Sequence, residues 1–259
     1  MNDYLISDPA ERKERAADKE KWVLDFLREE IYSVTKVLAE QMAIGERAAR
    51  TTLNRMEKKG FLVKDEVKFM AGKAVPIWGI SATGMMEGLT PEEVSTIKLK
   101  YHSPGRVSPV TIAHTIDVQK YRTYCEFELD YEGWKPTRLL PALNEKSGHP
   151  SRWAVYPDGV AFARTKDDKL FPIAIEVERT RKTPARYVQL IRGHLKNVQM
   201  QRYQKITYVC LTQKAADSLQ ALFLRLMVEK DISLYMNEQR YSPEQSLTLF
   251  RFRSMEDLS

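Results

Sequence analysis

The sequence is poor in cysteine and in long apolar runs, and both absences exclude whole classes of protein. Its 259 residues include only two cysteines, Cys125 and Cys210, and no CxxC pair, which argues against a disulfide framework or a zinc ribbon. No stretch reaches the roughly 18 apolar residues of a membrane helix, and the segment from Met1 to Lys21 is charged and has no apolar core. We therefore expect neither a membrane span nor secretion, and we expect a cytoplasmic protein.

The sequence also lacks the short motifs of several common sites. It contains no GxxxxGK[ST] phosphate loop, no GxGxxG and no GxSxG, so these nucleotide-binding and hydrolase signatures are set aside. No two histidines lie close enough in sequence for an H-x-H or HExxH metal pair. The histidines are His102, His114, His149 and His194.

Charge is abundant and nearly balanced. Lys and Arg number 41 against 35 Asp and Glu, which gives a formal net charge of +6, and 43% of the residues are hydrophobic. That hydrophobic content suffices for a core and for one or two domains. Because the net charge is modest, the places where basic residues cluster carry the information about partners.

The N-terminal third has the element order of a winged helix. Helical spacing predicts a first helix over residues 18–29 and, with Ser33 as its cap, a second over residues 34–42. A third helix is predicted over residues 46–59, followed by Gly60 in the left-handed position that ends helices. Two strand-like runs follow, 61–69 and 75–80, joined across Ala71-Gly72-Lys73. We therefore expect a winged-helix DNA-binding domain within residues 1–87.

The third predicted helix has two contrasting sides. Ala49, Thr52, Leu53 and Met56 fall on one side at 3.6 residues per turn and are expected to pack inward. The opposite side carries residue types that contact phosphates and base edges. These candidate DNA-binding residues are Arg47, Arg50, Thr51, Asn54 and Lys58. The alternative is an ordinary solvated polar face.

Residues 88–108 are predicted to form a linker with one short helix, capped by Thr90, and a second domain is expected over residues 109–259. Its element order is α-β-β-β-α-β-α. This order predicts a fold with both helices and strands, α/β or α+β, in which helices flank a mixed sheet. The predicted ranges are helix 110–129, strands 136–143, 152–164 and 170–178, helix 184–202, strand 206–211 and helix 214–229.

Three carboxylates in this domain form a candidate metal site. Asp158 lies in or just before one predicted strand, and Glu176 and Glu178 end the next strand on one face, because side chains alternate along a strand. Carboxylate oxygens are ligands for a hard divalent cation, Mg²⁺ or Mn²⁺. The alternative is a pair of surface glutamates next to a turn aspartate.

A basic stretch follows the carboxylates directly. Residues 179–216 hold nine Lys and Arg and no Asp or Glu, which suits binding of a phosphodiester backbone beside a metal that cleaves it. Lys196, on the helix that follows Pro184, is a candidate catalytic lysine, with a solvated side chain as the alternative. His194 on the same helix is expected to be a packed, hydrogen-bonded residue. The candidate strand-binding residues are Arg179, Arg181, Lys182, Arg186 and Arg192.

Two resemblances add to this reading. The stretch from Arg50 to Leu62 and the stretch from Trp78 to Gly84 look like winged-helix regulators. Pro157-Asp158-Gly159 followed by Glu176-Val177-Glu178 looks like the core of the PD-(D/E)XK nuclease fold. With residues 113–118 upstream and the winged helix in front, the chain resembles the replication-relaxation proteins, and among them the MobC-type plasmid mobilisation relaxases.

The resemblance implies a site-specific and strand-specific DNA nickase that initiates conjugative mobilisation at a plasmid transfer origin. It implies double-stranded and single-stranded origin DNA as substrates, and an accessory mobilisation protein and a coupling protein as partners. A non-enzymatic regulator of replication or transcription remains the alternative, as does an accessory protein that has kept the nuclease fold without its chemistry.

Two departures from the family patterns leave questions open. Glu178 stands where the nuclease pattern has lysine, so either Lys196 substitutes or Glu178 is a third metal ligand. Better-known relaxases use a tyrosine nucleophile with a histidine-bound metal, and the histidine spacing here does not fit that arrangement. Hydrolysis and tyrosyl transfer, with Tyr187 or Tyr203 near the site, are both compatible with the sequence.

Overall fold

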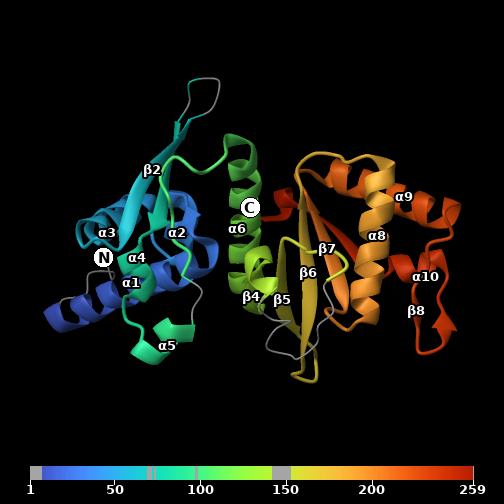
Figure 1. Ribbon diagram of the computed structural model, residues 1–259, viewed down its shortest axis with the longest axis horizontal. Coiled ribbons are helices and arrows are strands. Elements are labelled where there is room, and N and C mark those ends of the chain that lie inside the picture. Colours follow the sequence, from blue (N-terminus) through green and yellow to red (C-terminus); the bar gives the residue numbers. More distant parts are fainter. Residues whose placement is uncertain (1–7, 69–71, 73, 97–98, 142–152, 259) are drawn as a thin grey trace, which may run out of the picture. The chain divides into compact units, whose positions relative to one another are not determined.

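The structure of the protein is a computed structural model, which describes residues 8–68, 72, 74–96, 99–141 and 153–258 (Figure 1). The described residues form a mixed α/β structure and divide into two compact units, Met1–Gln119 and Lys120–Ser259. The border falls inside helix α6 (Pro109–Phe127). The functional domains predicted over 1–87 and 109–259 stay a prediction. Within the described ranges, no helix combines the length and the apolarity needed to cross a membrane.

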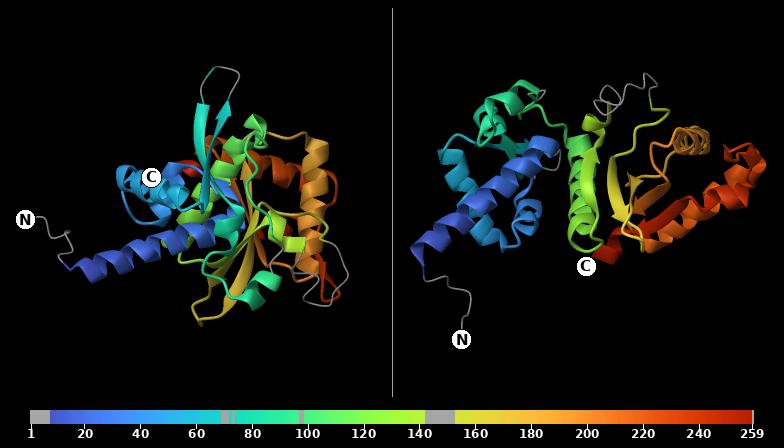
Figure 2. Two further views of the ribbon diagram at one scale, coloured as in Figure 1. Left: turned by 60° about the vertical axis from the view of Figure 1, so that its left-hand side comes forward. Right: turned by 90° about the horizontal axis from the view of Figure 1, so that it is seen from below.

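The N-terminal unit is mainly helical and contains a small antiparallel sheet. Before α6 its elements are α1 (Pro9–Glu30), β1 (Tyr32–Ser33), α2 (Thr35–Gln41), α3 (Glu46–Lys58), β2 (Leu62–Lys68), β3 (Ala74–Ile80), α4 (Ala82–Met86) and α5 (Pro91–Thr96). The sheet has the order β1-β3-β2, and the β2–β3 hairpin reaches beyond α2 and α3, with Val67 and Ile77 packed against Ile112 of α6 (Figures 1 and 2). Ala71 and Lys73, expected in its turn, lie outside the described residues.

One apolar core joins the helices of this unit to the hairpin. Leu27 of α1, Leu38 of α2 and Leu53 of α3 are fully buried together with Ile80 of β3. Gly60 has φ +78°, as the sequence predicted for the residue that ends the third helix. The helix-helix-helix-hairpin order and the buried side of α3 therefore agree with the expectation.

Two predictions about helix starts in this unit are wrong. Helix α1 begins at Pro9 rather than near residue 18, because the Asp8 side chain accepts a hydrogen bond from Ala10 N and caps the helix. Ser33 does not cap α2, whose N-cap is Val34 without a side-chain bond. The Ser33 hydroxyl is fully buried and donates to Gln119 Oε1 at 2.7 Å. A long-range partner has thus replaced the local one.

The C-terminal unit contains a five-stranded mixed sheet. After α6 its elements are β4 (Glu132–Pro136), the 3-10 turn η1 (Thr137–Leu139), β5 (Gly159–Arg164), β6 (Leu170–Glu178), α8 (Pro184–Gln199), β7 (Lys205–Cys210), α9 (Gln213–Glu229), β8 (Tyr235–Met236), β9 (Gln239–Arg240), α10 (Pro243–Leu247), β10 (Phe250–Ser254) and η2 (Met255–Leu258).

The strand order in this sheet is β10-β7-β6-β5-β4. Strands β4, β5 and β6 pair antiparallel, whereas β6, β7 and β10 are parallel. Helices α8 and α9 pack on one face, and the part of α6 from Lys120 onward lies on the other (Figure 2). The carboxyl ends of β6 and β7 therefore meet at one edge, where α8 and α9 begin.

The sequence misplaced two strands of this unit and missed the strand β10. A strand was expected over 136–143, but β4 ends at Pro136 and a 3-10 turn follows, while residues 142 and 143 lie outside the described ranges. Of the run 152–164, only β5 is a strand; residue 152 is outside the described part, and 153–158 approach the sheet irregularly. Strand β10 was not predicted at all. Its Arg251 and Arg253 alternate with Phe250 and Phe252, which is the alternation typical of a strand, so the sequence did carry a signal for it.

Candidate functional site

Helix α3 presents its predicted polar side to solvent. Ala49, Thr52, Leu53 and Met56 are buried, and the side opposite to them is exposed. Arg50 makes a 3.4 Å ion pair with Glu46 one turn earlier, and the Thr51 hydroxyl donates to Arg47 O. The five residues brought together on this exposed face are Arg47, Arg50, Thr51, Asn54 and Lys58.

In the C-terminal unit, Asp158 and Glu176 occupy facing positions on neighbouring chain segments. Strands β5 and β6 pair with Gly159 opposite Ile175, so Asp158, one residue before β5, falls opposite Glu176. The Asp158 side chain accepts a hydrogen bond from Val177 N through Oδ2 at 2.8 Å. Its main-chain oxygen accepts from Thr137 N at 3.1 Å. These bonds fix Asp158 at the carboxyl end of β6.

Glu176 projects from β6 into the interface with α8. Its side chain is only 12% exposed, and Oε1 lies 3.2 Å from His194 Nε2. That contact lacks hydrogen-bond geometry, so within the described part of the chain both atoms are buried without a hydrogen-bond partner. Burial, reinforced by nearby Glu178, raises the pKa of Glu176 to about 8, against a weaker opposing effect of Lys182. A buried oxygen in this state is one that a bound cation would satisfy.

His194 and the two nearby tyrosines are packed into the core. Burial lowers the pKa of His194 to about 3, so the imidazole is neutral, and its Nδ1 lies 2.7 Å from the Tyr203 hydroxyl. The expectation of a packed, hydrogen-bonded His194 is confirmed. Tyr187 and Tyr203 are both fully buried, and burial raises the pKa of both phenols, for Tyr187 to about 12. Neither hydroxyl is exposed for attack on a phosphodiester.

Glu178 is engaged differently from Glu176, although both face the same side of β6. Its Oε1 accepts a hydrogen bond from the Tyr187 hydroxyl at 3.0 Å, and its Oε2 forms an ion pair with the Lys182 ammonium. Lys182 therefore lies at the end of β6, four residues after Glu178. The sequence identified Lys182 only as a strand-binding residue. No spacing rule could have predicted this pairing, because residues four apart face each other only within a helix and the chain bends after Glu178.

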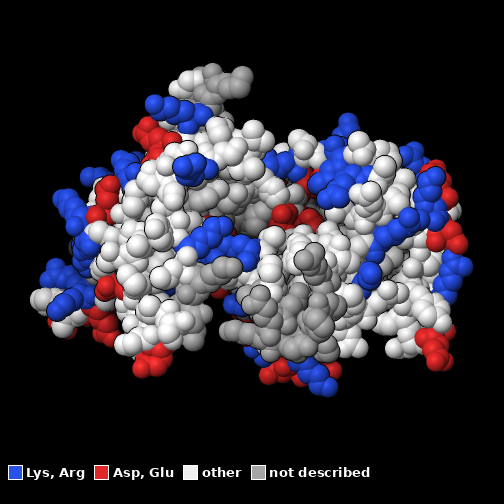
Figure 3. All heavy atoms as spheres, in the orientation of Figure 1, with Lys and Arg blue, Asp and Glu red and all other residues white. Residues whose placement is uncertain are grey.

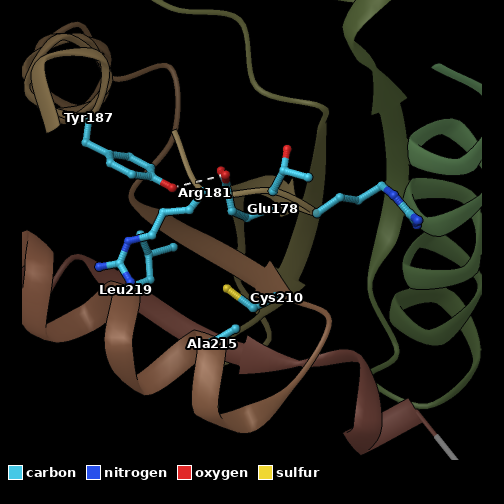
Figure 4. Close-up of a pocket in the computed structure, with 8 residues that line it drawn as sticks. Glu178, Arg181, Tyr187, Cys210, Ala215 and Leu219 are labelled. Carbon is cyan, nitrogen blue, oxygen red and sulfur yellow. Dashed lines mark hydrogen bonds between the residues drawn. The ribbon is translucent and has the colours of Figure 1, made fainter. Parts of the chain in front are cut away.

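A hollow opens beside Glu178 where β6 and β7 end and α9 begins. Figure 4 shows Glu178 and Tyr187 directed toward each other and Arg181 reaching toward α9. The Arg181 guanidinium donates to the Ser218 hydroxyl at 2.7 Å and to Ser218 O at 3.3 Å. Cys210 forms part of the lining, and burial raises its pKa to about 11, so it is a poor nucleophile. The hollow is thus lined by apolar side chains, among them Ala215 and Leu219, and by the Arg181 guanidinium, which Ser218 holds in place.

Basic side chains gather around this end of the unit (Figure 3). Arg179, Arg181 and Lys182 lie in the exposed connection between β6 and α8, and Arg186 lies in the first turn of α8. Arg186 is close enough to Glu176 to oppose the rise of its pKa.

Two other predicted basic residues lie elsewhere on α8. Arg192 and Lys196 are exposed, whereas Tyr187, Ile191 and His194 form part of its buried side. Lys196 follows His194 by two residues, about 200° around the helix, so the structure does not bring it to the carboxylates.

The three predicted carboxylates do not form a ready-made metal cage. Over the described ranges, no group of three or more His, Cys, Asp or Glu side chains is arranged to hold a metal ion. Asp158 and Glu176 are the two that lie opposite each other, and Glu178 binds Lys182 and Tyr187 instead.

The chain was also compared with known proteins. No protein-family model matches it, and no curated protein is significantly similar to it.

Proposed function

We propose that this protein is a metal-dependent DNA endonuclease that nicks one strand at a plasmid transfer origin. The observation that carries the proposal is the Asp158–Glu176 pair. Two carboxylates lie opposite each other at the end of a sheet, and one of them has a buried oxygen with no hydrogen-bond partner among the described residues. A basic connection follows directly. This combination suits a divalent cation and a phosphodiester.

The order of helices and strands supports the two folds that this proposal assumes, a winged helix and a PD-(D/E)XK-like domain. Three antiparallel strands, a crossover helix and a parallel fourth strand agree with a PD-(D/E)XK-like domain. Three helices and a hairpin agree with a winged helix, in which the exposed side of α3 reads duplex DNA. In the proposal, α3 selects the site and the C-terminal unit cuts it.

Asp158 and Glu176 would hold Mg²⁺ or Mn²⁺, and the unpartnered Glu176 oxygen fits that role. When bound, the cation would stabilise charge on the phosphate and activate a water molecule. Lys182, held by Glu178, supplies a cation where the nuclease pattern has its lysine. Arg181 and Arg186 bind the phosphate backbone beside it. Because Tyr187 and Tyr203 are buried, the proposal takes hydrolysis rather than tyrosyl transfer as the reaction.

A DNA-binding regulator without catalysis is the second candidate. It is favoured by one observation: both oxygens of Glu178 are occupied by protein groups, so this carboxylate contributes nothing to a metal site. The recognition face of α3 would serve such a regulator equally well.

Incubation of the purified protein with a supercoiled origin plasmid separates the two candidates. We expect open-circular product with Mn²⁺ or Mg²⁺, no product with EDTA, and a nick that maps to one strand. Proteinase treatment should leave the product unchanged, because hydrolysis leaves no protein on the DNA end. Site-specific binding without a nick under any divalent metal would overturn the proposal and support the regulator.

A further inference from the structure

Beneath α8, a group of polar side chains is buried in an otherwise apolar interface. His194, Asn197 and Tyr203 are all fully buried, among neighbours such as Leu195 and Ile206. Burying an amide, an imidazole and a phenol costs free energy unless each finds partners. Asn197 bonds the main chain before Asp158, and the Tyr203 hydroxyl bonds both Asn197 and the imidazole of His194, which lies next to Glu176.

Asn197 clamps the main chain that leads to Asp158. Its Oδ1 accepts from Ala154 N at 2.8 Å, and its Nδ2 donates to Val155 O at 2.7 Å. The clamp is close: a Cβ at Gly193 of α8 would lie 3.0 Å from Val155 Cβ. Residues 153–158 belong to no helix or strand, so they are held by these side-chain bonds, by the bonds from Thr137 to Pro157 O and Asp158 O, and by the bond from Val177 N to Asp158.

The same network reaches Glu176 from the other side. Asn197 Nδ2 also donates to the Tyr203 hydroxyl at 2.9 Å, and that hydroxyl lies 2.7 Å from His194 Nδ1. His194 Nε2 in turn lies 3.2 Å from Glu176 Oε1. One chain of hydrogen bonds, Asn197–Tyr203–His194, therefore connects the clamp on residues 154–155 to the imidazole that packs against Glu176.

We infer that Asn197, Tyr203 and His194 are positioning residues that hold Asp158 and Glu176 at the separation that a divalent cation requires. The inference rests on the proposed function, because it concerns the residues proposed to hold the metal. Partners behind the ligands of a metal site change its affinity by about 10-fold to 100-fold when they are removed. The Tyr203 hydroxyl contacts both Asn197 and His194, so it connects the residue that holds the segment before Asp158 to the residue next to Glu176.

Tyr203→Phe removes this hydroxyl and little else, and Tyr208→Phe is its matched control. Tyr208 is also fully buried in the same core, but within the described part of the chain its hydroxyl has no hydrogen-bond partner. Mn²⁺ binding to each DNA-free protein is measured by the loss of the free-ion signal in electron paramagnetic resonance. We expect Tyr203→Phe to weaken Mn²⁺ binding about tenfold or more, and Tyr208→Phe to leave it within about twofold.

Hydrogen exchange without metal gives a second reading. The amides of Ala154 and Val177 donate to Asn197 and Asp158, so they should exchange faster in Tyr203→Phe than in Tyr208→Phe. If Tyr203→Phe does not fold, His194→Gln takes its place with the same two measurements. Equal Mn²⁺ affinity and equal exchange in the two phenylalanine variants would overturn the inference. Failure of the wild-type protein to bind Mn²⁺ would instead overturn the proposed function.

Discussion

Replacing Glu176 by alanine is expected to reduce metal-dependent nicking by about a thousandfold and to leave duplex binding unchanged. The substitution removes the carboxylate that would carry the cation, and a metal at a phosphoryl centre contributes several kcal/mol to the transition state. Each tenfold in rate corresponds to about 1.4 kcal/mol, so the loss amounts to roughly three powers of ten. The measurement is the rate of open-circle formation with saturating Mn²⁺, next to a binding assay on the same DNA.

Glu229→Ala is the control for this prediction. Glu229 ends α9, is 54% exposed and pairs only loosely with Arg225, at 3.8 Å. It should nick at the wild-type rate. Nicking by Glu176→Ala at a rate similar to that of Glu229→Ala would show that Glu176 holds no catalytic metal, whatever the protein binds.

Replacing Arg50 or Asn54 by alanine is expected to weaken binding to the origin duplex by about 10-fold to 100-fold. Both side chains are exposed on α3, on the side opposite its buried stripe. Arginine paired to guanine and asparagine paired to adenine are each worth about 1–3 kcal/mol against the wrong base. Titrations with the origin duplex and with a scrambled duplex at one stated salt concentration measure the effect, which should be larger for the origin.

Arg225→Ala matches Arg50→Ala closely. Arg225 is 61% exposed against 65% for Arg50, and each guanidinium pairs with a glutamate one helical turn away. The two variants lose the same charge from the same kind of ion pair. Equal affinities of both for the origin duplex would show that α3 does not read the sequence.

Helical periodicity predicted α3 well because the helix is regular and packs on one side only. Four residues at the 3.6-residue spacing proved buried, among them Leu53 and Met56, and the polar residues between them are exposed. Strand alternation in the same way placed Glu176 and Glu178 on one side of β6. In both cases the local repeat decides the direction of the side chain, and no distant contact overrides it.

The partners of these side chains could not be predicted, because they come from distant parts of the chain. Ser33 had the features of a helix cap, yet its hydroxyl bonds Gln119, 86 residues later. The spacing in the sequence placed Glu176 and Glu178 on the same side of the strand. It could not show that Glu176 lies against His194 whereas Glu178 pairs with Lys182. The bonds from Asn197 to residues 154 and 155 could not be predicted from the sequence. Both are made to main-chain groups, which every residue has, so the identity of the partners gives no indication of them.

The measurement that tests the central claim most directly is anomalous diffraction at the manganese edge from crystals of the wild-type protein grown with Mn²⁺. The account predicts one strong peak between the carboxylates of Asp158 and Glu176, with Glu178 still bonded to Lys182 and Tyr187. A peak at another group of side chains, or none between Asp158 and Glu176 at saturating Mn²⁺, would contradict it.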